Sequence, residues 1–80
     1  MEDYLEEVKK IIAKKFDLDI NSIEEDSFIE ADLNITELDM EDLVPIIEDK
    51  YQIEIPLSLS SKFKQISDIA NFLYEYVDQA

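Results

Sequence analysis

The chain has no cysteine, histidine, glycine, arginine or tryptophan among its 80 residues. Without cysteine it forms neither a disulfide nor a zinc–thiolate site. Without histidine it lacks the usual general base and the commonest metal ligand. It also has no apolar run of about 18 residues and no basic start followed by an apolar segment, so it predicts neither a membrane span nor a signal peptide. We therefore expect a soluble, cytoplasmic protein that is not an enzyme and has no metal site.

The lack of glycine, together with only two prolines, favours helices over turns and strands. Strong helix formers occur throughout the chain, so we expect an all-α protein. Turns that need a positive φ must use residues such as asparagine, and Asn34 is a candidate for one. Hydrophobic residues make up 46% of the chain, which is enough to form a core despite the high charge. At this length we expect a single domain, residues 1–80.

Acidic residues outnumber lysines by 21 to 7, which gives a net charge of −14. The excess is concentrated between residues 24 and 54, where twelve acidic residues stand with one lysine, Lys50. Such a surface repels nucleic acid. It attracts a basic patch on a protein partner, chiefly by speeding association. Solubility alone explains the acidity equally well.

Three segments have the apolar spacing of amphipathic helices. The first, residues 3–15, has Asp3 at the N-cap position and lysines in its last turn, where the helix dipole favours cations. The second is expected to begin at Thr36, with Asp39 at the capping-box position. Its Pro45 is expected to remove a backbone hydrogen bond and to kink the helix. The predicted core faces are Leu5, Val8, Ile11, Ile12 and Phe16 in the first helix, Leu38, Leu43, Ile46, Ile47 and Tyr51 in the second, and Ala70, Phe72, Leu73, Tyr76 and Val77 in the third.

The remaining segments are predicted to connect these helices. Residues 17–35 form a long loop whose apolar residues should hold it over the core, and ordered loops of this length are often functional. Residues 51–56 are typical of an extended connector before a proline, and residues 58–63 of a short helix. Ser67 is expected to cap the last helix. Three main helices, one short helix and a long first loop predict a small up-and-down four-helix bundle.

The segment from Asp32 to Pro56 has the order and spacing of a known family motif, without a gap. The matching positions are Asp32-Leu33, Leu38-Asp39, Leu43-Val44, Glu48 to Tyr51, and the Glu-Ile-Pro ending at Pro56. Asn34, Thr36 and Glu37 stand within the motif but differ from the residues of the family. In this pattern the chain resembles the acyl carrier proteins. In that family a Gly-x-Asp-Ser-Leu motif opens the second helix, and its serine carries a 4'-phosphopantetheine arm.

The chain has Glu37 where the family has that serine, and a glutamate has no hydroxyl to accept the arm. The resemblance therefore implies an acyl-carrier-like monomer without a cofactor, which acts as a protein-interaction or regulatory module. Its expected partner presents a basic patch, as an enzyme that uses acyl carriers would. The second helix is the docking helix of the family, although a solvated face explains its acids equally well. The candidate partner-binding residues are Glu37, Leu38, Asp39, Glu41, Asp42, Glu48 and Asp49.

Other interpretations remain open from the sequence. Asp26-Ser27-Phe28 also has an Asp-Ser-aromatic order, so Ser27 or an unusual acceptor could carry 4'-phosphopantetheine in a working carrier of fatty-acid, polyketide or related biosynthesis. Otherwise Ser27 is a loop hydroxyl bonded to nearby backbone. The resemblance also implies a space for an acyl chain between the second and third helices, which bulky residues such as Ile55 and Phe63 are expected to fill. An unrelated small acidic helical protein is the third interpretation.

Overall fold

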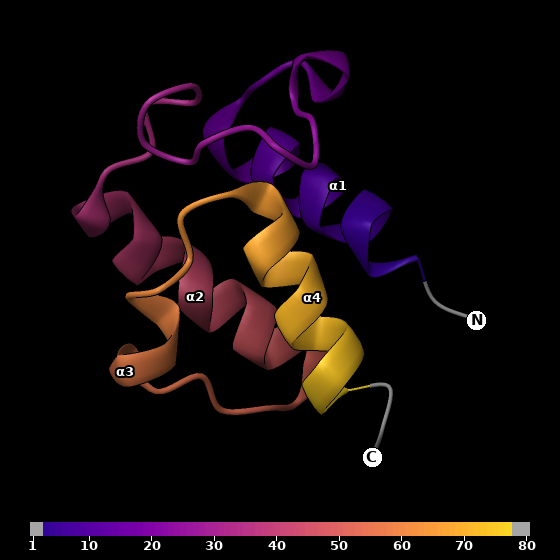
Figure 1. The fold of residues 1–80 in the computed structure, drawn as a ribbon, viewed down its shortest axis with the longest axis vertical. Helices are drawn as coiled ribbons and strands as arrows, with labels where there is room; N and C mark the ends of the chain where they lie inside the picture. Colours follow the sequence, from indigo (N-terminus) through magenta and orange to yellow (C-terminus); the bar gives the residue numbers. More distant parts are fainter. Residues whose placement is uncertain (1–2, 78–80) are drawn as a thin grey trace.

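The computed structural model describes residues 3–77, and the predicted domain limits at residues 1 and 80 lie outside this range. The described chain contains helices and no named strand. The elements are α1 (Tyr4–Phe16), the short 3₁₀ helix η1 (Ile20–Ser22), α2 (Glu37–Tyr51), α3 (Leu57–Ser60) and α4 (Ile66–Tyr76). Figure 1 shows their order from the N-terminus to the C-terminus. The predicted all-α bundle of three main helices and one short helix is confirmed.

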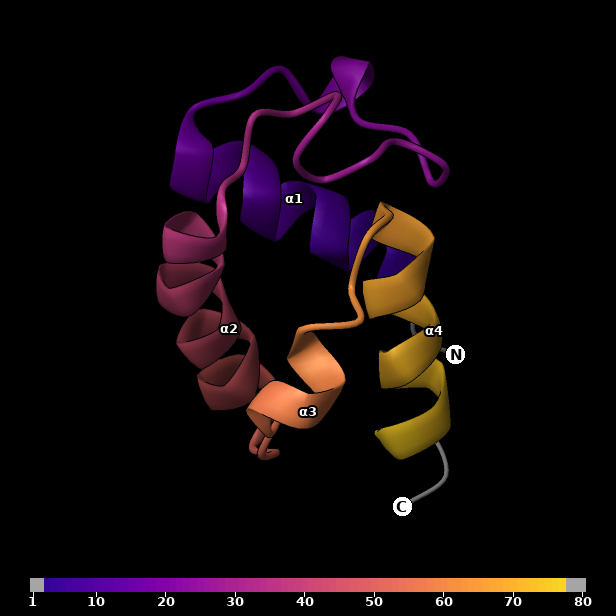
Figure 2. The ribbon, with the colours of Figure 1, turned by 60° about the vertical axis from the view of Figure 1, so that its left-hand side comes forward.

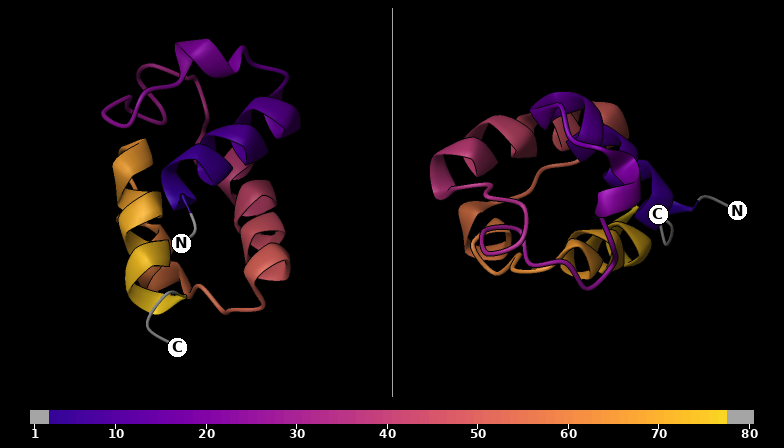
Figure 3. Two further views of the ribbon diagram at one scale, coloured as in Figure 1. Left: turned by 90° about the vertical axis from the view of Figure 1, so that its right-hand side faces the viewer. Right: turned by 90° about the horizontal axis from the view of Figure 1, so that it is seen from above.

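The three main helices surround a shared core. In Figure 2, α1 spans from α2 to α4 beneath the long loop, while α3 lies between the lower parts of α2 and α4. The left view of Figure 3 shows α1 and the long loop toward one end of the molecule, and the right view looks down on that end. The most extensive contact between two helices is that of α1 with α4. None of the described helices has the length and apolar character needed to span a bilayer.

Helix α1 and helix α2 begin where the sequence predicts. The Asp3 carboxylate accepts a hydrogen bond of 3.2 Å from the Glu6 N–H at the start of α1. Thr36 is the N-cap of α2, and its hydroxyl accepts from the Asp39 N–H at 3.2 Å. The Asp39 carboxylate accepts in return from the Thr36 N–H at 3.0 Å. This reciprocal pair is a capping box, which satisfies two donors that a helix start would otherwise leave unpaired.

The predicted left-handed turn at Asn34 is confirmed, with φ at 58°. Asp17 and Gln52 adopt the same backbone conformation, and they end α1 and α2 respectively. All three residues take the conformation that glycine usually provides at a helix end or a tight turn.

The prediction that Ser67 caps the last helix is wrong. Helix α4 begins at Ile66 with Gln65 as its N-cap. The Asp68 carboxylate accepts from the Lys64 and Gln65 N–H groups, both at 2.9 Å. The Ser67 N–H instead donates to the Glu25 carbonyl at 2.8 Å. The unpaired N–H groups at this helix start are therefore satisfied by a carboxylate three residues further along the chain rather than by a serine hydroxyl at the N-cap.

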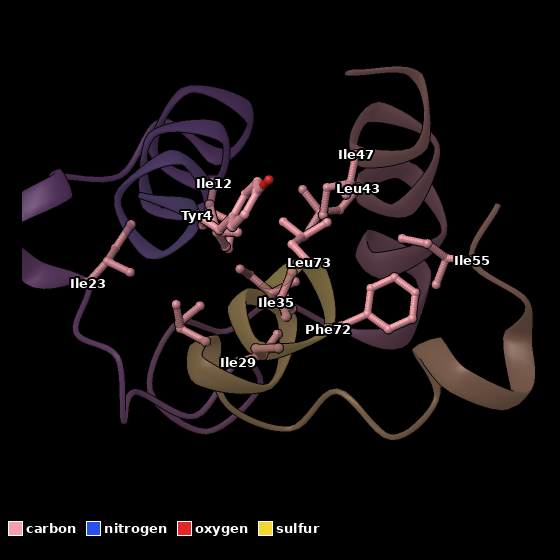
Figure 4. Packing of buried hydrophobic residues seen from close by; sticks show 13 residues of the cluster. Tyr4, Ile12, Ile23, Ile29, Ile35, Leu43, Ile47, Ile55, Phe72 and Leu73 are labelled. Atoms are coloured by element: carbon pink, nitrogen blue, oxygen red, sulfur yellow. The ribbon is translucent and has the colours of Figure 1, made fainter. Parts of the chain in front are cut away.

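The long loop packs over the core, as expected. Its residues Ile23, Ile29 and Ile35 are buried. Three backbone hydrogen bonds join the loop to the start of α4 and the residues before it. The Ile29 N–H donates to the Lys64 carbonyl at 2.8 Å. In the other direction, the Ile66 N–H donates to the Ser27 carbonyl at 3.1 Å, and the Ser67 N–H to the Glu25 carbonyl at 2.8 Å. Figure 4 shows side chains of this loop meeting those of α1, α2 and α4 in one cluster.

Part of the predicted core face is wrong. Leu38 is 74% exposed, and Tyr76 and Ile46 are exposed to 51% and 38%. Leu43 and Ile47 are fully buried and Tyr51 packs against the core as predicted, whereas Met40 and Val44 supply the rest of the inner face of α2. The reason is helical phase, because Leu38 precedes Leu43 by five residues and so lies on the other side of the helix, and Ile46 is one residue out of phase with Ile47. Tyr76 stacks on Phe72 at the end of α4, with ring centroids 4.4 Å apart.

Pro45 lies inside helix α2 without ending it, and the expected kink at this residue stays a prediction. The helix runs from Glu37 to Tyr51 through this residue. Pro45 is exposed, so the carbonyl of Glu41, which loses its helical donor, lies on the side where water can satisfy it.

Replacing Pro45 by alanine should therefore stabilise the fold. The variant restores the N–H donor for the Glu41 carbonyl, and the gain exceeds the loss of the rigidity that proline gives the unfolded chain. We expect the free energy of unfolding to rise by about 1–2 kcal/mol. Urea denaturation followed by circular dichroism measures it, with Asp42→Ala as a control that changes an exposed residue of the same helix. A loss of stability in Pro45→Ala would contradict this account.

Candidate functional site

The candidate site is the exposed side of α2, beginning at its first residue. Glu37 is exposed and follows the Thr36 cap directly, so its carboxylate stands at the helix N-terminus. An acid in this place is favoured by the helix dipole, by about 0.3–1 kcal/mol. The local backbone is fixed on both sides, by the left-handed turn at Asn34 and by the capping box.

Two of the predicted site residues have a structural use. Asp39 is half-buried and holds the capping box at the start of α2. Glu48 is also half-buried, and its carboxylate accepts a hydrogen bond of 2.6 Å from the Ile55 N–H. This bond holds the connector after α2 against the helix, because Ile55 would otherwise lack a partner for its N–H in a buried position. The acidity of α2 is thus partly explained by the fold.

The other five predicted residues are exposed and share one side of the helix. Their spacing places them in two neighbouring rows. The first row contains Glu37 and Glu41 and continues to Glu48. The second row consists of Leu38, Asp42 and Asp49. The structure therefore brings together an acidic surface with one exposed leucine near its start.

A groove of about 970 Å³ lies beside this surface, between α2 and α3. Glu37, Met40, Glu41, Val44 and Pro45 line it from α2. Buried isoleucines form its floor, and α3 with the segment that follows forms its other wall. From the long loop the lining residues are Ile29, Glu30 and Ile35, and Ile55 comes from the connector after α2. From α3 and the segment after it they are Leu57, Ser58, Ser60, Ser61, Phe63 and Lys64.

The expectation that bulky side chains fill this space is wrong for part of it. Ile55 and Phe63 line the groove without closing it. Leu43, Ile47 and Phe72 lie in the core cluster instead, and Figure 4 shows the Phe72 ring pointing toward Ile55. Sequence reasoning missed Met40, Val44 and Lys64 as groove residues. The helical repeat from Glu37 through Met40 and Glu41 to Val44 is the signal that was available.

Ser27, the alternative attachment residue, is almost fully buried, with 9% of its surface exposed. Its hydroxyl accepts a hydrogen bond of 2.9 Å from the Glu24 N–H, and its carbonyl accepts from the Ile66 N–H. This is the local backbone bonding expected of a serine in a loop. Within residues 3–77 no group of three side chains is placed to hold a metal ion.

Comparison with known proteins decides the family. A curated protein of Helicobacter hepaticus, named "Acyl carrier protein", is 32% identical over 71 residues, which is 89% of this chain and 93% of that protein. The chain belongs to the acyl carrier protein family. Acyl carrier proteins of Campylobacter jejuni subsp. doylei and Campylobacter lari are 31% and 32% identical over 68 residues, which is 85% of this chain and 88% of each relative. No protein-family model matches the chain.

The family motif fits the observed backbone at Asn34. The motif of the acyl carrier family has glycine at this position, and the structure has a left-handed residue there. Glycine adopts this conformation most readily, and asparagine is among the other residues that tolerate it. The turn before α2 is therefore retained with a different residue.

Glu48 and its neighbour Asp49 offer a test of the structural use of acids in α2. Glu48→Ala removes the acceptor of the buried Ile55 N–H and should lower the free energy of unfolding by about 1–3 kcal/mol. Asp49→Ala, the control, removes an exposed charge and should change stability by about 0.5 kcal/mol or less. Thermal unfolding of both variants measures the difference. Equal stability of the two variants would contradict a structural use of Glu48.

Proposed function

We propose that this chain is an acyl-carrier-like protein that carries no 4'-phosphopantetheine at the usual position and acts as a protein-interaction or regulatory module. Its partner presents a basic patch, and an enzyme that uses acyl carriers is the leading candidate. The protein acts as a monomer in the cytoplasm and catalyses no reaction itself. The observation that carries the proposal is the exposed Glu37 at the start of α2, next to an acidic helix face.

The chemistry of Glu37 supports the first part of the proposal. Attachment of the arm needs a hydroxyl oxygen that attacks the pyrophosphate of coenzyme A. A carboxylate at this place repels that pyrophosphate, because like charges at close range destabilise each other. The side chain nevertheless stabilises the helix start. Glu37 thus keeps the structure of the motif without its acceptor group.

The distribution of charge supports the second part. Glu37, Glu41, Asp42 and Asp49 remain exposed on one side of α2, although Asp39 and Glu48 are used within the fold. With a net charge of −14, such a surface speeds the encounter with a basic partner. A regulator of this kind would compete with carriers that hold an acyl group.

The alternative is a working carrier, which the names of the curated relatives favour. Ser27 is poorly suited to accept the arm. Its modification would require the loop to open and its hydroxyl to leave the Glu24 N–H. Thr36 is the hydroxyl residue next to Glu37 in the chain, but its oxygen already accepts from the Asp39 N–H.

The purified protein should keep its unmodified mass after incubation with coenzyme A and a phosphopantetheinyl transferase. Intact-mass spectrometry measures the result, and an authentic acyl carrier protein serves as the positive control. Addition of one phosphopantetheine group, mapped by peptide analysis to any residue, would overturn this part of the proposal.

The variant Glu37→Ser should stay folded, because serine also begins helices well. Its free energy of unfolding should change by about 1 kcal/mol or less.

Binding to a partner should depend on the exposed acids of α2. A phosphopantetheinyl transferase is a suitable probe, because its substrate is a carrier protein and it must bind the protein itself. The triple variant Glu41→Gln, Asp42→Asn, Asp49→Asn should slow association severalfold and change dissociation less. Surface plasmon resonance measures both rates, and added salt should weaken binding because exposed charges are screened beyond about 10 Å at 0.1 M.

The control for this experiment is Glu24→Gln, Glu25→Gln, Glu75→Gln, which removes the same number of exposed charges outside α2. It should slow association much less. If both triple variants behave alike, net charge alone drives association and α2 is no docking face.

A further inference from the structure

The tyrosines are the side chains of this protein that lose a single electron most readily. The chain has four tyrosines and no tryptophan or cysteine. Its two methionines are oxidised in a different way, by gain of an oxygen atom to form the sulfoxide. Among the tyrosines, Tyr51 at the end of α2 has a hydroxyl that is engaged with a carboxylate.

Tyr51 joins the end of α2 to the first turns of α1. Its hydroxyl donates a hydrogen bond to Oε1 of Glu7, and both side chains are half-buried. An ionised acceptor makes such a bond stronger than one between two neutral groups. The ammonium group of Lys50 lies 5.7 Å from the centre of the Tyr51 ring. The structure therefore holds a phenol and a base in the geometry that proton transfer requires.

This geometry favours loss of the electron and of the proton in one step. A phenol that loses an electron becomes a strong acid and gives its proton to the base that it contacts. For Tyr51 this base is the carboxylate of Glu7. The exposed phenols of Tyr74 and Tyr76 would have to give their protons to water, which is a weaker base than a carboxylate. The Lys50 ammonium also opposes positive charge on the Tyr51 ring, so the proton leaves with the electron.

A row of aromatic rings connects Tyr51 with the surface. The Tyr4 ring meets that of Tyr51 edge to face, with centroids 5.7 Å apart, and meets that of Tyr74 in the same way at 4.8 Å. Tyr4 is buried, and Figure 4 shows its ring extending from α1 into the core cluster. Tyr74 belongs to α4 and is 36% exposed. Rings at these separations are in contact, which is close enough for an electron to pass from one to the next.

We propose that Tyr51 and Glu7 form a proton-coupled one-electron redox site, which exchanges electrons with the surface through Tyr4 and Tyr74. The co-reactant is a one-electron oxidant, such as a peroxyl radical or an oxidised metal complex. One electron leaves Tyr51 for the oxidant, the phenol O–H bond breaks, and the proton moves to the carboxylate of Glu7. The products are a neutral tyrosyl radical, a carboxylic acid and the reduced oxidant.

The fold favours return of the electron over damage to the protein. A one-electron reductant reverses the step, because the proton on Glu7 stays within hydrogen-bond distance of the phenoxyl oxygen. Tyrosyl radicals are otherwise lost when two of them couple to dityrosine. The half-buried Tyr51 ring is shielded from such an encounter, and the net charge of −14 makes two copies of the chain repel each other.

Flash photolysis of the full chain tests this proposal. Tris(bipyridine)ruthenium(III), generated by the flash with hexaammineruthenium(III) as quencher, is the oxidant. Optical absorption follows the rate at which the tyrosyl radical forms and decays, and electron paramagnetic resonance of frozen samples confirms its identity. We expect a radical that decays without forming dityrosine. Tyr51→Phe keeps the ring but lacks the hydroxyl, and should abolish this long-lived radical. Tyr76→Phe, the control, removes a tyrosine outside the row and should retain it.

A second pair of variants tests the proton acceptor. Glu7→Gln keeps an oxygen that accepts a hydrogen bond, but an amide is too weak a base to take the proton. It should slow formation of the radical about tenfold or more. Glu6→Gln makes the same change of charge one residue away and should leave the rate unchanged. This comparison decides the proposal even if Tyr51→Phe does not fold, which circular dichroism checks for every variant.

Three results would overturn the inference. The first is a radical of unchanged yield and lifetime in Tyr51→Phe, which would place it on another tyrosine. The second is equal rates in Glu7→Gln and Glu6→Gln, which would exclude Glu7 as the proton acceptor. The third is rapid accumulation of dityrosine in the unaltered chain, which would exclude a reversible site. Tyr4→Phe should slow formation of the radical severalfold, and an unchanged rate would refute the path through Tyr4.

Discussion

The fold depends on the attachment of the long loop to the start of α4. Three backbone hydrogen bonds, from Ile29, Ile66 and Ser67, join two segments that are far apart in the sequence. They place Ile23, Ile29 and Ile35 over the core and so complete the burial that three helices alone would leave unfinished. An 80-residue chain without disulfides has little core to spare. The same attachment fixes the point at which α2 begins, and with it the position of Glu37.

The residues on the different sides of helix α2 have different roles. Leu43 and Ile47 face the core and hold the helix in the bundle. Asp39 and Glu48 satisfy backbone donors at the start of the helix and after its end. The other acidic residues of α2 are exposed and can contact solvent or a partner. A count of acids therefore overstates the docking surface, since a carboxylate that accepts a buried N–H cannot be moved to a partner without loss of stability.

Much of this arrangement follows from local chemistry that is visible in the sequence. Asp3, Thr36 and Asn34 were predictable because caps and left-handed turns depend on one residue and its near neighbours. Leu38 was misplaced because its phase on the helix is decided by the packing of Leu43 and Ile47, five and nine residues later. The groove was not predictable, since it depends on how far α3 stands from α2, a distance that no local pattern encodes. The acidic residues of α2 were found from a family resemblance, yet their division between structural and exposed ones needed the structure.

The three left-handed turns bear on the entropy of folding. Asp17, Asn34 and Gln52 adopt a conformation that is strained for residues with a side chain. Glycine would relieve that strain, but it would also give the unfolded chain more conformations to lose on folding. These two effects are each about 1 kcal/mol and opposite in sign. A chain without glycine can therefore make sharp turns at little net expense, and its unfolded ensemble is restricted in advance at the positions where the folded backbone changes direction.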